Sequence, residues 1–456
     1  MSSFVFNVTR HAPELLPPAE QTPYEFKELS DIDDQDGLRF HIPSFLIYEH
    51  SGDQNDPVMV IKKAVAKALV SYYPFAGRLR EKEGRKLVVE CNGEGIIFIE
   101  ANANANLKIF GYPLLPPFPC LDELLWHVPG STDILDAPLM LIQVTRFKCG
   151  GFIFALQYNH TMADAQGIML FLNAVAEHAS GAQSLSTPPV WQRHLLNARK
   201  PPHVKFQHRE YEEVLAETND TLIPVNDLVD KSFFFGPKQI AALRRLIPPH
   251  QKASTFEILS ACLWRCRTIA LQLHPQQLVR FMCIVNSRNL FNPPLPPGYY
   301  GNGFAFPVAL STVSKLSRNP IGYSLNLIQQ AKSAVTEEYM KSVADFMVLN
   351  GRPRFSTSIS SFIVSDVTRS GSDNLDLGWG SPVYGGPAKG GVGAVPGISS
   401  FYIPFKNVNG EKGIVVPLCL PANAMEIFVK EINGLLGSVL NSPNKGHGSS
   451  ILISSL

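Results

Sequence analysis

Apolar runs of strand length alternate with amphipathic helical stretches along the chain, and this alternation limits what the chain can fold into. The first half carries strand-like runs such as "KLVVEC", "GIIFIEA", "LMLIQVTRF" and "GFIFALQY". Between and after them, apolar side chains recur at helical spacing over residues 61–72 and 165–179. Alternating strands and helices predict an α/β fold in which helices cover mixed sheets.

The chain is also too long for a single core. Its 456 residues exceed the roughly 150 residues typical of one domain. A polar, proline-broken stretch over residues 183–214 has the composition of a linker. We therefore expect an N-terminal domain over residues 1–182, a crossing segment over 183–214 and a C-terminal domain over 215–456. Helices are expected in the C-terminal domain at residues 237–247, 254–273 and about 423–440.

Composition excludes several classes of function. The 40 basic residues against 39 acidic ones leave a net charge of +1, so no overall field attracts nucleic acid or an anionic membrane. No apolar run reaches the roughly 18 residues that a membrane span requires. The N-terminus has no basic region followed by an apolar core, so we expect no secretory signal and a cytoplasmic protein.

Two further features bear on the compartment. Seven cysteines, odd in number and scattered through apolar segments, are interpreted as reduced, buried thiols of an intracellular protein. The ending Ser454-Ser455-Leu456 resembles a peroxisomal signal but lacks its basic residue. A peroxisomal location is therefore the alternative to the cytoplasm.

The segment "QYNHTMADAQG" places His160 and Asp164 four residues apart, between an apolar strand-like run and the helical stretch 165–179. Such a corner exposes a side chain on a rigid scaffold. In the simplest interpretation Thr161 is the helix cap and forms a capping box with Asp164, which leaves His160 without chemistry. Alternatively, the neutral imidazole of His160 is a general base that takes a proton from an alcohol.

Two other interpretations of this corner have less support. A metal site would need a third ligand, and the chain has no HExxH or CxxC pattern. A Cys-His hydrolase would need a nucleophile, and nothing marks which of the seven cysteines would supply it.

Four ordered segments over nearly the whole chain resemble the plant BAHD acyltransferases, which transfer an acyl group from coenzyme A to an alcohol or amine. The His-x-x-x-Asp signature of that family is matched by His160 and Asp164, and its Asp-Phe-Gly-Trp-Gly signature is matched by residues 376–380. The runs "YPFAGR" and "PPLPPGYYGN" occur at the order and spacing of the family. The resemblance implies two similar chloramphenicol-acetyltransferase-like domains with the active-site channel between them.

By this resemblance His160 is the general base, and Asp164 points away from the substrate and pairs with Arg288 as a structural support. Another set is expected to lie away from the histidine and to support the fold and the CoA side: Asp376, Gly378, Trp379 and Gly380. The resemblance implies acyl-CoA and a small alcohol as substrates, with no covalent acyl-enzyme, no metal and no bound cofactor. It also implies a monomer, while the near-neutral charge predicts neither nucleic-acid nor membrane partners.

The chain departs from the family pattern in three places. Leu377 replaces the usual Phe, and Asn286 stands where many relatives carry Asp. Some relatives carry, before a Ser on the preceding strand, a Thr proposed to bind the tetrahedral intermediate. Here Val364 precedes Ser365, so the oxyanion donor stays unassigned.

A site for coenzyme A is expected at "KASTFE". Lys252 and the hydroxyls of Ser254 and Thr255 lie where a helix begins, and its positive end could meet a phosphate; the resemblance points to the same region. Alternatively, Ser254 is an N-cap with Glu257 completing a capping box. The glycine-rich run from Gly391 has Pro396 at the third glycine position of a dinucleotide fingerprint, and no helix follows it.

Within the family, the runs "YGGPAKGGVGAVPGISSFYIPFKN" and "SDIDDQDGLRFHIP" look most like alcohol acyltransferases such as the benzyl alcohol benzoyltransferases and the enzymes that make volatile esters. We therefore expect transfer of an aromatic acyl group, with benzoyl favoured, to an alcohol. The alternatives are acetyl transfer to a volatile alcohol, acylation of an alkaloid alcohol and a member of the family without catalysis.

Overall fold

The structure is a computed structural model of the chain. It describes residues 6–50, 52, 55–111, 114–118, 120–130, 133–212, 227–353, 358–391 and 397–437, together with the backbone of 438–440 and 452–455. Among the described residues, no helix is both long and apolar enough to cross a membrane.

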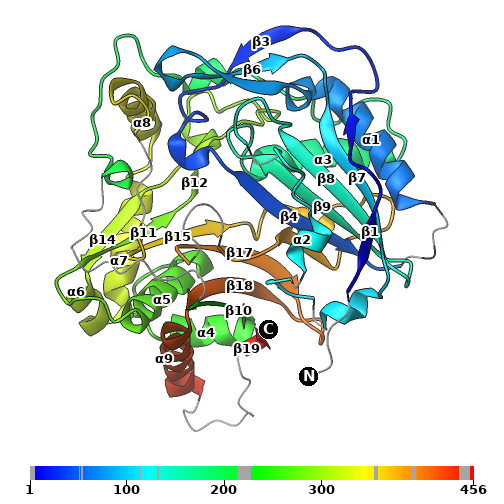
Figure 1. Ribbon diagram of the computed structural model, residues 1–456. Coiled ribbons are helices and arrows are strands. Elements are labelled where there is room, and N and C mark those ends of the chain that lie inside the picture. The colour runs from blue at the N-terminus through cyan, green and yellow to red at the C-terminus, as the bar shows by residue number, and fades with distance from the viewer. Residues whose placement is uncertain are drawn as a thin grey trace.

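The first half is built on a seven-stranded sheet with the order β1-β7-β8-β9-β4-β16, to which β2 is added by pairing with β7. Its strands are β1 (Val8–Arg10), β2 (Glu14–Leu16), β4 (His41–Tyr48), β7 (Ile96–Ala103), β8 (Met140–Arg146), β9 (Phe152–Asn159) and β16 (Tyr384–Pro387). The sheet is mixed, because β7 and β8 run parallel while β8 and β9 run antiparallel. Helices α1 (Pro57–Ser71) and α3 (Ala165–Ala179) cover one of its faces (Figure 1).

The second half is built on another seven-stranded sheet, with the order β14-β11-β15-β17-β18-β10-β19. Its strands are β10 (Leu228–Phe235), β11 (Leu278–Cys283), β14 (Val308–Thr312), β15 (Ser361–Asp366), β17 (Ser399–Lys406), β18 (Lys412–Pro421) and β19 (Leu452–Ser455). The helices of this half are α4 (Pro237–Arg244), α5 (Thr255–Ala270), α6 (Val313–Arg318), α7 (Ile321–Ser333), α8 (Glu337–Leu349) and α9 (Ala422–Leu440). Helices α4, α5, α7 and α9 share one core with this sheet (Figure 1).

Smaller elements complete the described chain. A three-stranded sheet joins β3 (Glu25–Glu28), β5 (Arg78–Glu81) and β6 (Leu87–Cys91), and a two-stranded sheet joins β12 (Val285–Asn286) and β13 (Phe304–Ala305). Helix α2 (Leu121–Leu124) precedes β8. The described part of the crossing segment, 183–212, contains the short 3-10 helices η5 (Arg193–Leu196) and η6 (Arg209–Tyr211).

The two sheets meet through the faces that these helices leave uncovered. Alternate residues of a strand face opposite sides, so Phe154 of β9 packs under the helices while Ile153 lies in a core shared with β17 and β18. Strand β16, which comes late in the chain, pairs with β4 of the first sheet. The second half is thus joined to the first both by packing and by backbone hydrogen bonds.

The expected helices are present, but helix α1 begins earlier than the sequence predicted. Helix α3 spans the expected residues 165–179. Helix α1 begins at Pro57, before the expected start at residue 61, because Asp56 caps it by accepting a hydrogen bond from Val58 N and Pro57 suits the first helical position. In this first turn Met59 is exposed, but Val58 is buried in the core of the first half, so the apolar stripe begins one turn earlier than expected.

Candidate active site

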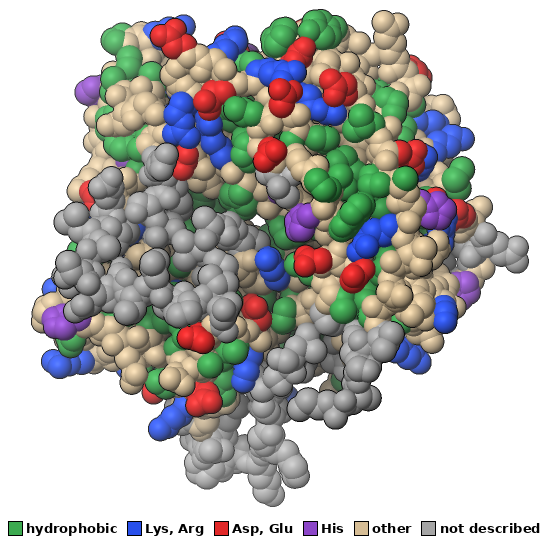
Figure 2. All heavy atoms as spheres, viewed as in Figure 1, with side chains coloured by type: hydrophobic (Ala, Val, Ile, Leu, Met, Phe, Trp, Pro, Cys, Tyr) green, Lys and Arg blue, Asp and Glu red, His purple; other side chains and the backbone are tan. Residues whose placement is uncertain are grey.

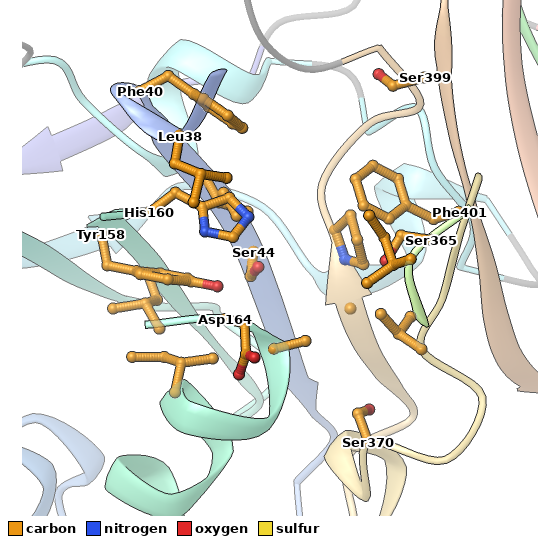
Figure 3. Close-up of a pocket in the computed structure, with 18 of the residues that line it drawn as sticks. Leu38, Phe40, Ser44, Tyr158, His160, Asp164, Ser365, Ser370, Ser399 and Phe401 are labelled. Carbon is orange, nitrogen blue, oxygen red and sulfur yellow. The ribbon is translucent and has the colours of Figure 1, made fainter. Parts of the chain in front are cut away.

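A cavity of about 450 Å³ lies between the two sheets. One wall comes from β4, β9 and the first turns of α3, and the facing wall comes from β15 and β17 (Figure 3). Figure 2 shows acidic and basic side chains interspersed on one face of the molecule, which is hollowed near its centre. A concave, mostly apolar cavity with few polar groups is the usual form of a small-molecule site.

The chain turns sharply between β9 and α3, and His160 lies in this turn. The side chain of Asn159 organises the turn, because its Oδ1 accepts hydrogen bonds from the backbone nitrogen (3.1 Å) and the hydroxyl (2.8 Å) of Thr161. The backbone N–H of His160 donates to the carbonyl of Phe40 at 2.9 Å. The interpretation of Thr161 as the helix cap is therefore wrong: its hydroxyl serves this turn, and the N-cap of α3 is Asp164.

Both carboxylate oxygens of Asp164 are engaged with protein groups. Oδ1 accepts from the backbone N–H of Gly167, Oδ2 accepts from that of Gly303, and Arg288 donates to both oxygens at 2.8 Å. Burial raises the pKa of Asp164, but the charge and hydrogen bonds of Arg288 outweigh burial and leave the pKa below its usual value. The ion pair with Arg288 that the resemblance implies is present, so Asp164, although part of the cavity wall, is committed to structure.

The second half approaches the first turn of α3 very closely at Gly167. A Cβ atom on Gly167 would lie 2.1 Å from the backbone carbonyl oxygen of Tyr300. Arg288 and Gly303, which hold Asp164, come from the same half. The turn that carries His160 is therefore clamped between the two halves of the chain.

His160 is surrounded by aromatic rings. The centroid of its ring lies 5.4 Å from that of Phe40, 5.9 Å from that of Phe304 and 6.5 Å from that of Tyr158. Nδ1 is buried and has no hydrogen bond of ordinary geometry to any described residue, so Nε2 is the nitrogen open to the cavity (Figure 3). Burial lowers the pKa of His160, and nearby carbonyls and the charge of Asp164 offset this only in part. The imidazole is therefore neutral at pH 7 and able to accept a proton.

The lowered pKa of His160 sets the direction of the pH dependence. Because the base is the neutral imidazole, kcat/KM is expected to stay constant as the pH falls to the usual histidine pKa of 6.5, and to decline only as the pH drops through the lowered pKa. Rates measured from about pH 5 to pH 8, with the fold followed by circular dichroism, test this. An acidic limb centred above the usual value would contradict a buried imidazole as the base.

The tract from Asp376 to Gly380 forms a tight turn outside the cavity lining. Asp376 Oδ1 accepts from the backbone N–H groups of Gly378 (2.7 Å) and Gly380 (2.8 Å), and these glycines have φ angles of 109° and 81°, which favour glycine. Trp379 packs edge-on against Phe152 of β9, with ring centroids 5.1 Å apart. The tract thus anchors a late part of the chain on the first sheet.

The three departures from the family pattern have structural counterparts. Leu377 is fully buried in the core of the first half, and Asn286 Oδ1 accepts a hydrogen bond from the backbone N–H of Arg288 at 3.0 Å. Val364 lies in the core of the second half, whereas Ser365, one residue later on β15, lines the cavity. Because alternate residues of a strand face opposite sides, the hydroxyl of Ser365 faces the cavity while Val364 faces the core.

Lys252, Ser254 and Thr255 lie at the start of α5 and outside the cavity lining. Ser254 caps the helix: its Oγ accepts from the backbone N–H of Glu257 at 3.3 Å, and its own N–H donates to the Glu257 carboxylate at 2.9 Å. The Thr255 hydroxyl accepts from Arg244 at 3.1 Å, and Lys252 is exposed. The capping box is confirmed, while phosphate binding at these three residues stays a prediction.

The cysteines lie outside the cavity lining. All seven are free, and five of them are buried, but Cys149 is exposed and Cys120 is half-buried, so the expectation that all would be buried is wrong for these two. Burial raises the pKa of Cys91 and of Cys283 to about 12, which keeps these thiols protonated and weakly nucleophilic.

Among the described residues, no three His, Cys, Asp or Glu side chains are grouped to hold a metal ion. The glycine run from Gly391 continues into residues 392–396, which lie outside the described residues.

Comparison with known proteins identifies the family. A family model described as "Transferase family" matches residues 6–435. The chain belongs to the BAHD transferase family. A benzyl alcohol O-benzoyltransferase of Nicotiana tabacum is 62% identical to this BAHD acyltransferase over 438 residues, which cover 95% of each chain.

Solved structures share the fold of this BAHD acyltransferase. Vinorine synthase superposes with a TM-score of 0.73 at 20% identity, covering 94% of this chain and 98% of that one. TRI101 of F. graminearum, complexed with coenzyme A and T-2 mycotoxin, superposes with a TM-score of 0.69 at 15% identity, covering 89% and 97%. The expected fold, mixed sheets with helices in two chloramphenicol-acetyltransferase-like domains, is confirmed, and so is the expectation of an acyltransferase.

Proposed function

We propose that this BAHD acyltransferase transfers a benzoyl group from benzoyl-CoA to benzyl alcohol or a similar neutral, apolar alcohol. The observation that carries the proposal is the 62% identity, over nearly the whole of both chains, to a benzyl alcohol O-benzoyltransferase. The aromatic rings around His160 support it, because they suit an aromatic acyl group or alcohol.

The charges in the cavity wall support a neutral acceptor. Arg39 pairs with Asp34 and Glu81, and Asp164 pairs with Arg288. Another wall carboxylate, Asp36, pairs with Arg85 at 2.7 Å. A charged acceptor would lose its hydration without finding an unpaired counter-charge here, whereas an apolar alcohol gains from burial.

In the proposed reaction Nε2 of His160 takes the proton of the alcohol hydroxyl. The alcohol oxygen attacks the thioester carbonyl carbon, and the tetrahedral intermediate collapses with cleavage of the carbon–sulfur bond. The CoA thiolate then receives the proton from the imidazolium, which returns His160 to its neutral state. The acyl group passes directly to the alcohol, and acyl-CoA serves as a co-substrate.

Ser365 is the proposed donor to the thioester oxygen, since its hydroxyl lies on the wall opposite His160 (Figure 3). Loss of one donor that stabilises a developing oxyanion costs about 10²-fold in kcat, so we expect a decrease of that order in Ser365→Ala with KM little changed. Ser361→Ala is the matched control, because Ser361 lies on the same strand but outside the lining. Equal rates in the two variants would remove Ser365 from the mechanism.

The proposed function is tested by release of free CoA thiol. Purified protein is supplied with benzoyl-CoA or acetyl-CoA and with benzyl alcohol, methanol, hexenol or an alkaloid alcohol, and the products are identified by mass spectrometry. We expect the highest kcat/KM with benzoyl-CoA and benzyl alcohol. A preference for acetyl-CoA with hexenol, or for the alkaloid alcohol, would replace the proposed substrates and keep the acyl transfer.

The phosphates of CoA are proposed to bind at the start of α5. The proposed contacts are Lys252, Ser254 and Thr255, and Lys252→Ala should raise KM for acyl-CoA without lowering kcat.

A monomer in the cytoplasm remains the proposal, with the peroxisome as the alternative. Ser454 and Ser455 lie in β19, paired with β10, and Leu456 lies outside the described residues.

A further inference from the structure

Among the described side chains, Asn302 interacts with the imidazole of His160 by hydrogen bonding, which partly offsets the lowering of the His160 pKa by burial. Nδ1 has no hydrogen bond of ordinary geometry to a described residue, and the Asp164 carboxylate is committed to Arg288 and backbone N–H groups. The direction of Nε2 therefore depends on Asn302, on the packed rings and on the backbone of residues 160–162.

Two side chains hold three successive backbone carbonyls of this turn. Asn302 Nδ2 donates to the carbonyl of His160 at 2.9 Å and to that of Thr161 at 3.3 Å. Arg193 Nη2 donates to the carbonyl of Met162 at 2.8 Å. The backbone of the turn is thus fixed from the side that faces away from the cavity.

Both of these side chains converge on the carboxylate of Asp33. Its Oδ1 accepts from Arg193 Nη1 at 2.7 Å, and from Asn302 through the backbone nitrogen at 2.8 Å and Nδ2 at 2.9 Å. Its Oδ2 accepts from the backbone nitrogen (3.0 Å) and the hydroxyl (2.5 Å) of Ser30. Asp33 and Arg193 are 0% and 1% exposed, so this ion pair is shielded from water and from salt.

The three residues come from distant parts of the chain. Asp33 belongs to the run "SDIDDQDG", Arg193 to the crossing segment and Asn302 to the run "PPLPPGYYGN". The fit is close, because a Cβ atom on Gly301 would lie 2.2 Å from Arg193 Nη1. A buried ion pair contributes little net stability compared with apolar packing, so its arrangement around the turn points to a role in geometry.

We propose that Asp33 is a positioning residue for acyl transfer: through Arg193 and Asn302 it fixes the backbone of residues 160–162 and thereby the direction of His160 Nε2. The inference rests on the proposed role of His160 as the base. Phe304, which follows Asn302 closely and packs on the imidazole at 5.9 Å, places a ring of the same segment against the base. Displacement of a catalytic group by about 1 Å can cost about 10²-fold in rate.

The test compares Asp33→Asn and Asn302→Ala with Asp31→Asn. Asp31 is the matched control, since it is 6% exposed and pairs with Lys86 and Arg352 at 2.8 and 2.9 Å rather than with Arg193 or Asn302. We expect kcat to fall about 10- to 100-fold in Asp33→Asn and Asn302→Ala, with KM for both substrates within about twofold. Asp31→Asn is expected to lower the melting temperature without lowering kcat.

The outcomes separate this inference from the proposed function. If wild-type protein turns over and His160→Ala does not, a wild-type kcat in Asn302→Ala, or an equal loss in Asp31→Asn, overturns the positioning role alone. If Asp33→Asn does not fold, Asn302→Ala decides, because it removes no charge. A crystal structure of Asn302→Ala gives a readout independent of turnover: a shifted His160 ring supports the inference, and an unchanged turn overturns it.

Discussion

Alanine in place of His160 is expected to reduce kcat by about 10² to 10⁴, the contribution typical of a general base. The reason is that His160 supplies the one imidazole among the described residues that line the cavity, with Nε2 open to the cavity and a pKa lowered by burial. The measurement is CoA thiol release at saturating benzoyl-CoA and alcohol. KM is expected to change much less than kcat, because proton transfer occurs in the transition state.

His41→Ala is the matched control for the loss of a half-buried imidazole whose pKa is lowered. His41 lies at the start of β4, outside the cavity lining, and burial lowers its pKa to about 4. Its replacement is expected to leave kcat near the wild-type value. If correctly folded His160→Ala kept more than about a tenth of the wild-type kcat, the loss would be smaller than a general base contributes. That result would contradict the assignment of His160 as the base.

Arg288→Met is expected to lower the free energy of unfolding by about 3 to 5 kcal/mol, the usual cost of leaving one partner of a buried ion pair unpaired. Asp164 and Arg288 have side chains only 9% and 7% exposed, and methionine keeps the length of the arginine stem while removing its charge. Denaturation by urea, followed by fluorescence, measures the loss. Because Asp164 also caps α3 and meets Gly303, the loss should include loosening between the two halves.

Arg146→Met is the matched control. Arg146 makes the same two-pronged contact with Asp56, at 2.7 and 2.6 Å, but these side chains are 26% and 39% exposed, so the expected cost is about 0 to 1 kcal/mol. Equal losses in the two variants would show that burial of the Asp164 pair adds nothing.

In wild-type protein the stability that Asp164 contributes is present above the ordinary pKa of a carboxyl group. It is lost as the pH falls through the lowered pKa of Asp164 in the folded protein.

Local patterns were sufficient to predict the elements that carry the site. The apolar run "GFIFALQY" predicts β9, and the periodicity of residues 165–179 predicts α3 with the same bounds. The capping box at Ser254 was also foreseeable, because Ncap and N3 are close in sequence. The cap at Asp164 was not, because Asn159 folds Thr161 into a turn that competes with helix.

The resemblance to the family predicted other site residues than local patterns did. It identified His160, and it identified Asp164 and Arg288, which form an ion pair in the structure. It gave no role to Asp33 or Asn302, because a buried polar residue looks like any solvated one in a sequence. Ser365 was passed over for a similar reason: only the pairing of β15 within its sheet decides which residues of that strand face the cavity.

Residue type and short-range spacing were enough to predict the alternation of strands and helices, the two signature motifs and the near-neutral charge. Where residues far apart in the chain meet is visible only in the folded protein. Residues 33, 193 and 302 converge on one carboxylate behind the base, and β16 joins the first sheet. Such contacts depend on the packing of two sheets against each other, and packing is set by long-range complementarity of shape and charge rather than by local pattern.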